Sequence, residues 1–307
     1  MRHIFWVVVA LWTTGFLHAE EYAARYRERL RILDKAAPES VCTAREALRE
    51  WMPLAEAGDR AALFHEFRGF YLAAIEDTNG PLSDAVKPIQ REMLGWMSAG
   101  RSVQDIVAGI YAKPDMRRAI GPWLRCGFAF DQGEGFFFPA LDSGTLLEFV
   151  PLLPPDLADF VRFSLAEAAQ RVGGDGALGL SWEELRERLM RWEEFARRYP
   201  QLPETHNVVE LEIPHLAELY FFGVDNTPTF DFGTGRIYPE LVASWSRLAA
   251  SDRESSYKGL AAALVLRIKE TGGKLSAGDR VLFEAAGYER EFDQWWRGVQ
   301  FRLNERR

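Results

Sequence analysis

The stretch Cys126–Pro139, CGFAFDQGEGFFFP, interrupts a long helical pattern and holds one of the two cysteines of the chain. Phe128 and Phe130 alternate with small or polar neighbours, residues 131–135 are rich in turn formers, and an apolar run follows before the proline. An alternating segment, a turn and a second apolar segment in this order predict a short β-hairpin. We therefore expect a helical chain organised around an aromatic hairpin.

The first 19 residues have the pattern of a secretory signal peptide. Arg2 supplies a basic start, residues 4–17 form an apolar run, and the small Ala19 precedes Glu20. The apolar run is shorter than the about 20 residues that cross a bilayer as a helix, which disfavours a membrane anchor. We expect cleavage after Ala19 and a periplasmic or secreted mature chain that does not span a membrane.

The charge balance of the 307-residue chain is acidic, with 37 basic and 45 acidic residues and a net charge of −8. Removal of residues 1–19 takes away Arg2, so the mature chain carries 36 basic and 45 acidic residues and a net charge of −9. A negative chain repels the phosphate backbone, so we expect no nucleic-acid partner.

The two cysteines, Cys42 and Cys126, would enter an oxidising compartment after export, where an even number of cysteines favours a disulfide. A bond that closes a loop of this length stabilises a fold by about 4 to 5 kcal/mol in the chain-entropy model. It would fasten the hairpin to the first helices.

A free Cys126 offers a second interpretation, a thiol-dependent hydrolase in which His206 or His215 acts as the base. Such a nucleophile requires partial exposure and a nearby base, and a disulfide would abolish it. The spacing of residues alone does not separate the two alternatives.

Apolar spacings of three and four residues predict helices over most of the remaining chain. The expected helices cover residues 20–35, 43–57, 59–78, 116–120, 156–172, 181–199, 238–250, 256–271, 277–286 and 289–303. Residues 208–213 alternate as in a strand, and residues 219–232 resemble a second aromatic hairpin. The predicted class is mainly α, with helical hairpins and two short aromatic β-hairpins.

Prolines at positions 151, 154 and 155 suggest a boundary between an N-terminal helical region, residues 20–150, and a C-terminal one, residues 151–307. Each region would contain one hairpin. A single domain is also compatible with this length.

The run Ala47–Tyr71, ALREWMPLAEAGDRAALFHEFRGFY, resembles the Sel1-like and tetratricopeptide helical repeats. The matching positions are Ala47, Ala55, Gly58, Ala62 and Phe70, whereas Phe67 stands where a glycine is expected. A second copy would contain Gly100, and the resemblance extends at most over residues 42–112. It implies stacked helix pairs that present a concave surface to another protein.

The sequence contains no recognised catalytic motif, and its histidines do not have the spacing of a zinc site. We therefore expect neither a metal nor a cofactor, and we interpret the chain as a non-catalytic protein that binds another protein. Two aromatic runs could anchor that partner if exposed: Phe136, Phe137, Phe138, Tyr220, Phe221 and Phe222.

The resemblance to Sel1-like repeats implies one specific form of this function, an immunity protein that neutralises a secreted toxin. A thiol-dependent hydrolase and an envelope scaffold remain alternatives. The sequence identifies neither the partner nor the oligomeric state.

Overall fold

The computed structural model describes residues 22–78, 84–101, 103–133, 136–174 and 176–304, with the backbone alone at residues 97, 103, 104, 131–133, 136–138, 303 and 304. The mainly α class is confirmed, because the described elements are helices apart from three two-stranded antiparallel sheets. Contacts divide the chain into two compact units, which we call unit 1 (residues 1–165) and unit 2 (residues 166–307). The division falls within the helix α9 (Pro155–Ala168).

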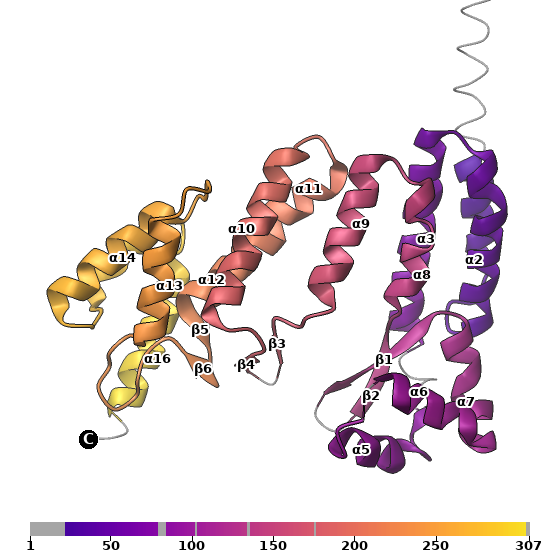
Figure 1. Ribbon diagram of the computed structural model, residues 1–307, viewed down its shortest axis with the longest axis horizontal. Helices are drawn as coiled ribbons and strands as arrows, with labels where there is room; N and C mark the ends of the chain where they lie inside the picture. Colours follow the sequence, from indigo (N-terminus) through magenta and orange to yellow (C-terminus); the bar gives the residue numbers. More distant parts are fainter. Residues whose placement is uncertain (1–21, 79–83, 102, 134–135, 175, 305–307) are drawn as a thin grey trace, which may run out of the picture. The chain divides into compact units, whose positions relative to one another are not determined.

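Unit 1 consists of helices and one hairpin (Figure 1). Its longer helices are a segment at residues 22–31, α2 (Pro38–Trp51), α3 (Ala57–Asp77), α5 (Gln90–Ser98), α6 (Val103–Ala112), α7 (Pro114–Arg125) and the first part of α9. Its shorter pieces are residues 84–86, η1 (Met52–Leu54), α8 (Ser143–Leu147) and η2 (Val150–Leu152). Prolines begin α2 and α7, where their fixed φ suits the helix and their missing N–H is not needed.

The core of unit 1 lies between α2, α3 and α7 and consists largely of aromatic and aliphatic side chains. Leu48 of α2, Phe64 and Phe67 of α3 and Ile120 of α7 are fully buried. The ring of Phe67 meets that of Phe149 edge to face at a centroid distance of 5.6 Å. This packing stabilises the pair α2 and α3, which lie side by side in Figure 1.

The predicted hairpin around residues 126–139 is confirmed. Strand β1 (Phe128–Gly133) pairs antiparallel with β2 (Phe136–Leu141), in a register that places Phe128 opposite Leu141. Tyr71 of α3 closes the base of the hairpin, because its hydroxyl donates to the Gly127 carbonyl and accepts from the Asp142 N–H at 3.0 Å. Burial raises the pKa of Tyr71 to about 12.

Gly127 must be glycine at this junction. Its φ of +98° is unfavourable for other residues, and an added Cβ would lie 2.3 Å from the Thr145 hydroxyl oxygen. The chain can therefore pass from α7 into β1 beneath Thr145 only because position 127 lacks a side chain.

An ion pair also joins the start of unit 1 to the segment after the hairpin. Glu148 accepts hydrogen bonds from Arg45 at 2.6 and 2.7 Å and from Arg49 at 2.7 Å, both arginines belonging to α2. Burial raises the pKa of Glu148, but these hydrogen bonds outweigh it and hold the pKa below the ordinary value.

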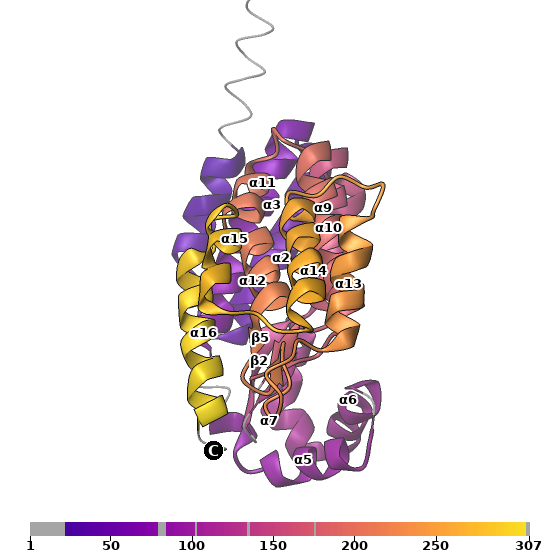
Figure 2. The ribbon, with the colours of Figure 1, turned by 90° about the vertical axis from the view of Figure 1, so that its left-hand side faces the viewer.

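Unit 2 contains the end of α9 and two groups of helices joined by short hairpins. Its elements are β3 (Gly173–Gly174), β4 (Ala177–Leu178), α10 (Trp182–Arg198), α11 (Pro203–Asn207), η3 (Val208–Glu212), α12 (Ile213–Phe222), β5 (Gly223–Val224), β6 (Thr227–Pro228), α13 (Pro239–Ala249), α14 (Lys258–Thr271), η4 (Ala277–Asp279), α15 (Arg280–Glu284) and α16 (Glu289–Asn304). Helices α13 and α14 pack side by side in both Figure 1 and Figure 2.

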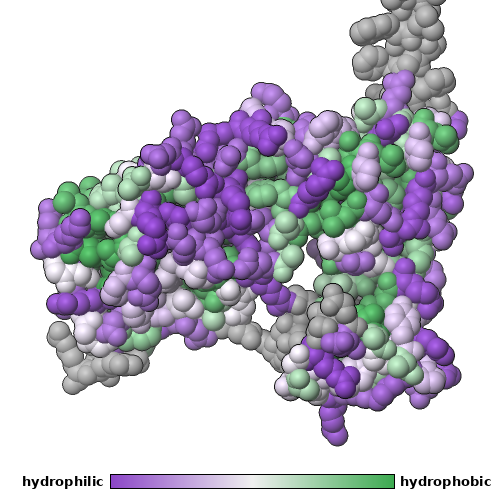
Figure 3. Space-filling model, viewed as in Figure 1, coloured by the Kyte–Doolittle hydropathy of each residue, from purple (hydrophilic) through white to green (hydrophobic). Residues whose placement is uncertain are grey.

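Helix α10 begins at the residue that its capping sequence predicts. Ser181 and Glu184 make a reciprocal capping box, and Leu185 and Leu189 are fully buried on the inner face. The outer face is charged, and Figure 3 shows the hydrophilic surface over this helix. The exposed Glu194, for example, contacts Arg253 at 3.1 Å.

A buried ion pair ties α10 to the end of α9 within unit 2. Arg188 and Glu167 have side chains that are 4% and 10% exposed, and their Nε and Oε2 atoms lie 2.6 Å apart without the alignment of a hydrogen bond. Arg191 holds the other carboxylate oxygen at 2.7 Å, and Arg188 also donates to the Gln170 carbonyl at 2.8 Å. Two arginines therefore compensate the charge of the buried Glu167 carboxylate.

Two predictions for unit 2 are wrong in detail. Residues 208–213 do not form a strand, because η3 is a π-helix continuous with α11 and α12. The hairpin predicted over residues 219–232 is shorter than expected, because residues 219–222 are the last turn of α12 and only residues 223–224 and 227–228 pair as strands. Residues 213, 216, 217 and 220 are buried at helical spacing, which outweighs the strand preference of the aromatic run.

Candidate functional site

The predicted disulfide between Cys42 and Cys126 is present, with the two Cα atoms 4.7 Å apart. It joins α2 to the residue that caps the C-terminal end of α7, immediately before the hairpin. Both cysteines of the chain are thereby used, and neither is free.

The disulfide counts against the hydrolase alternative. Cys126 is 4% exposed and its sulfur is bonded, so it offers no thiolate in this state. The proposed bases are both exposed, and His206 has only a distant carboxylate, with Nδ1 3.9 Å from Glu210 Oε1. Because both cysteines are joined in the disulfide, the described residues contain no free thiol that a histidine could activate.

The aromatic runs that we expected to anchor a partner have different outcomes. Phe136, Phe137 and Phe138 belong to β2, but their side chains lie outside the described part of the structure. Tyr220, Phe221 and Phe222 are 0%, 2% and 7% exposed, respectively. These three belong to the core of unit 2 and do not form an exposed interface, because α12 turns them toward α10, α13 and α16.

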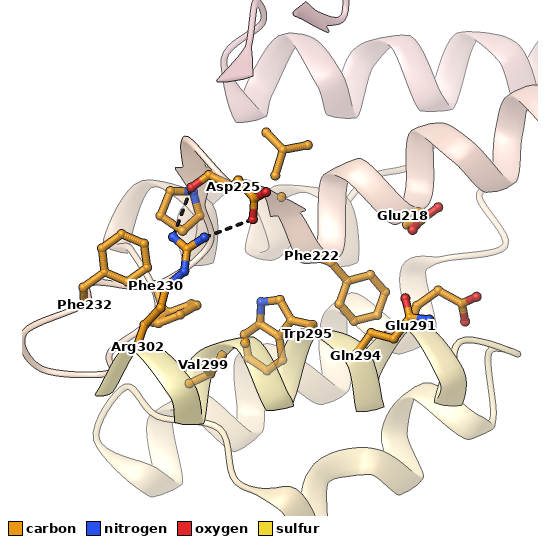
Figure 4. Close-up of a pocket in the computed structure, with 14 residues that line it drawn as sticks. Glu218, Phe222, Asp225, Phe230, Phe232, Glu291, Gln294, Trp295, Val299 and Arg302 are labelled. Carbon is orange, nitrogen blue, oxygen red and sulfur yellow. Dashed lines mark hydrogen bonds and ion pairs between the residues drawn. The ribbon is translucent and has the colours of Figure 1, made fainter. Parts of the chain in front are cut away.

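A pocket of about 230 Å³ lies in unit 2 where the end of α12, the hairpin β5–β6 and one face of α16 meet (Figure 4). We call it the α12–α16 pocket. The residues that line it are Glu218, Phe222, Gly223, Val224, Asp225, Pro228, Phe230, Phe232, Glu291, Gln294, Trp295, Gly298, Val299 and Arg302.

The sequence of the hairpin creates the opening beside α12. Gly223 ends the helix with φ +70°, and an added Cβ there would lie 2.5 Å from the Thr227 carbonyl oxygen. The chain therefore turns back sharply after Phe222, with Asp225 at the turn. Both Phe222 and Gly223 line the pocket beside this turn.

The floor of the pocket is aromatic. Trp295 and Phe222 lie together at its centre in Figure 4, with ring centroids 6.3 Å apart. Phe230 meets Trp295 edge to face at 5.8 Å, and the Trp295 indole N–H donates to the Thr229 hydroxyl at 3.0 Å. Because this hydrogen bond fixes the indole plane, the floor is formed before any ligand arrives.

At one end of the pocket, an arginine is already engaged in an ion pair. The Arg302 guanidinium lies 3.0 Å from Asp225 Oδ1, donates to the Asp225 carbonyl at 3.2 Å, and stands 4.7 Å from the centroid of the Phe232 ring. Figure 4 shows this pair at the end of the pocket formed by β5 and β6. Its charges compensate each other.

The other end carries two carboxylates, Glu218 of α12 and Glu291 of α16 (Figure 4). Glu218 is exposed, and the nearest cation to Glu291 is the exposed Arg290, whose Nε lies 3.7 Å away. The pKa of the neighbouring Tyr288 is raised by burial, by its hydrogen bond with Tyr257, and further by these two negative charges. This end of the pocket is therefore negative.

The sequence analysis missed this pocket, although α16 carries a signal for it. Glu291, Trp295, Gly298 and Arg302 follow each other at spacings of three and four residues, and Gln294 lies three residues after Glu291 and four before Gly298, so all five share one face of the helix. Trp295 also has helical spacing with Phe292 and Val299, a pattern that is typical of a core face. Phe292 and Val299 are indeed 1% and 3% exposed, whereas Trp295 is only half-buried and faces both the core and the pocket.

In the described part of the chain, no three metal-ligating side chains gather where they could hold an ion. No helix within the same residues has the length and apolar character required to cross a membrane. No family model matches the chain, and neither a curated protein nor a solved structure is similar to it. The resemblance to Sel1-like repeats thus stays a prediction.

Proposed function

We propose that the mature chain is an exported protein that acts by binding another protein, without catalysis. The observation that carries this proposal is the α12–α16 pocket, which combines a fixed aromatic floor with a charged rim. Trp295 and Phe232 are the half-buried aromatic side chains of the lining, and aromatic side chains that a partner can cover are typical anchors of protein interfaces. The lining contains no cysteine, serine, threonine, histidine, lysine or tyrosine, so the only side chains in it that could act as a nucleophile are the carboxylates of Glu218, Asp225 and Glu291.

The disulfide supports the exported state. A bond between the only two cysteines persists in an oxidising compartment and is rare in the cytosol. Together with the leader pattern of residues 1–19, it favours a periplasmic or secreted location. A finer form of the proposal, drawn from the repeat resemblance, is an immunity protein that neutralises a secreted toxin.

Export is tested by mass spectrometry of the protein recovered from the cell envelope. The expected mass is that of a chain beginning at Glu20 with no free thiol, because the leader has been removed and the cysteines are joined. A chain that retains residues 1–19 and two alkylatable cysteines would refute export.

Partner binding is tested by purifying the tagged mature chain from an envelope extract. One protein should copurify in a fixed ratio. That protein, produced separately, should then bind the mature chain in calorimetry with a defined stoichiometry. If nothing copurifies, or if the copurifying protein does not bind when produced alone, the proposed function fails.

A further inference from the structure

The size of the α12–α16 pocket indicates what it can accept. At about 230 Å³ it is smaller than the roughly 300 to 1,000 Å³ of pockets that enclose drug-sized ligands. Its lining comes from α12, α16 and the residues in and after the hairpin β5–β6, and it could accept one side chain of a partner that lies across these elements. A single side chain of a partner suits this volume better than a free metabolite does.

The aromatic floor narrows the chemistry of that side chain. Phe222, Phe230 and Trp295 present ring surface to the pocket, and Trp295 is the strongest cation-binding ring among the natural side chains. An aliphatic stem or a cation is equally compatible with such a surface. The floor alone does not distinguish a leucine from a lysine.

The charges around the rim of the pocket favour a cationic side chain over an aliphatic one. Three carboxylates line the pocket, those of Glu218, Asp225 and Glu291, but only one cation, Arg302. Arg302 already pairs with Asp225 and stacks on Phe232. At the opposite end the lining offers no cation to Glu218 or Glu291, and the cation near Glu291 is the exposed Arg290 outside the lining, whose Nε lies 3.7 Å away. An anionic ligand would be repelled there, and an uncharged ligand would gain nothing from these glutamate charges.

We propose that the α12–α16 pocket receives a basic side chain, lysine or arginine, from the protein partner. The aliphatic stem lies on Trp295 and Phe222, and the cationic end reaches Glu218 and Glu291. This inference rests on the proposed function and adds the chemistry by which the partner is recognised. The acidic charge of the whole mature chain favours the approach of such a basic partner.

The experiment is a titration followed by NMR at the Trp295 indole N–H, a reporter located on the floor of the pocket. Its signal is assigned by its disappearance in Trp295→Phe. The probe is the blocked peptide acetyl-Gly-Gly-Lys-Gly-Gly-amide, and the matched probe replaces lysine with glutamine. Chitotriose serves as a third probe because aromatic floors also stack on sugar rings.

The lysine peptide should shift the Trp295 signal in a saturable manner, and the glutamine peptide and chitotriose should not. Glu218→Gln and Glu291→Gln should each weaken lysine-peptide binding about 2- to 5-fold, the range for one exposed ion pair. Glu240→Gln is the control, because Glu240 is exposed, as Glu218 is, but lies on α13 outside the pocket. It should leave the affinity unchanged.

Three results would overturn the inference: equal shifts with the lysine and glutamine peptides, a saturable response to chitotriose alone, or unchanged affinity in the double variant Glu218→Gln/Glu291→Gln. The proposed function is tested separately by calorimetry with the copurified partner. If the partner binds normally to the double variant, only the chemistry assigned to the pocket is wrong. If no partner binds to the wild-type chain, the proposed function itself is wrong.

Discussion

Reduction of the Cys42–Cys126 disulfide should destabilise unit 1 and leave unit 2 unchanged. The bond closes a loop with a sequence separation of 84, for which the chain-entropy model gives about 4 to 5 kcal/mol. Both ends of the loop lie in unit 1, and the bond fixes α2 next to the hairpin junction at Gly127. Unit 1 should therefore bear the whole loss.

Hydrogen exchange measured by mass spectrometry resolves the two units in one experiment. In the reduced protein, the slowest amides of α3 and α7 should exchange roughly a thousandfold faster, because about 1.4 kcal/mol corresponds to each factor of ten. The amides of α14 in unit 2 are the internal control. The double variant Cys42→Ala/Cys126→Ala, made without reductant, should reproduce the effect.

The reasoning would be refuted if the exchange of α3 and α7 increased less than tenfold on reduction. It would also be refuted if α14 changed by the same factor. The first result would mean that the disulfide does not restrain the unfolded chain of unit 1. The second would mean that the two units unfold as one.

Three further substitutions test the packing and the charges. Gly127→Ala should lower the melting temperature of unit 1, because the new Cβ would collide with the Thr145 hydroxyl in a strained backbone. The shift should be about 2–4 °C for each kcal/mol of stability that is lost. A melting curve identical to that of the wild type would contradict this. Folding lowers the pKa of Glu148, so the charged carboxylate should contribute about 1.5–3 kcal/mol to the free energy of unfolding above its ordinary pKa of 4.5. This contribution should be lost as the pH falls through the lower pKa of the folded state. Urea unfolding of Glu148→Gln across this pH range should therefore show a difference from wild type that vanishes at low pH, and a difference that stays constant would contradict the prediction. Arg188→Ala should destabilise unit 2 by about 3–5 kcal/mol in the same assay, because Glu167 would keep only its more exposed partner, and a loss below about 1 kcal/mol would show that the buried pair is dispensable.

Much of unit 1 could be predicted because its signals are local. Cys126 and the alternating Phe128 and Phe130 indicated the hairpin, and export chemistry indicated the disulfide. The anchoring of the hairpin by Tyr71 could not be predicted, since its two partners lie 56 and 71 residues away in sequence. No spacing rule connects such distant positions.

Unit 2 shows why an aromatic run is ambiguous. Tyr220, Phe221 and Phe222 have strong strand preferences, yet α12 buries them because Leu216 and Ala217 continue the same apolar face one turn earlier. The sequence preference was local, and the packing that decided the outcome was tertiary. A count of helical spacing from residue 213 onward would have predicted the helix.

The candidate site escaped prediction for a related reason. Its floor combines Phe222, Phe230 and Trp295, which come from three elements, and only their packing brings them together. The helical spacing of Glu291 and Arg302 on α16 can be recognised in the sequence, but the same spacing occurs on any charged, solvated helix face. The negative end of the pocket depends on Arg302 pairing with Asp225 instead of with Glu218 or Glu291, and that pairing is decided by tertiary packing.

Binding of the copurified partner to two variants at Gly298 tests the central claim most directly. Gly298 lines the pocket from α16, and a Cβ added there meets no atom within 4 Å, so both Gly298→Ala and Gly298→Leu are compatible with the fold and raise helix propensity. Only leucine is large enough to fill much of the pocket. Calorimetry should show wild-type affinity for Gly298→Ala and a loss of about tenfold or more for Gly298→Leu, as expected when an interface anchor loses its pocket. Equal affinities in the two variants would contradict the claim that this pocket binds the partner.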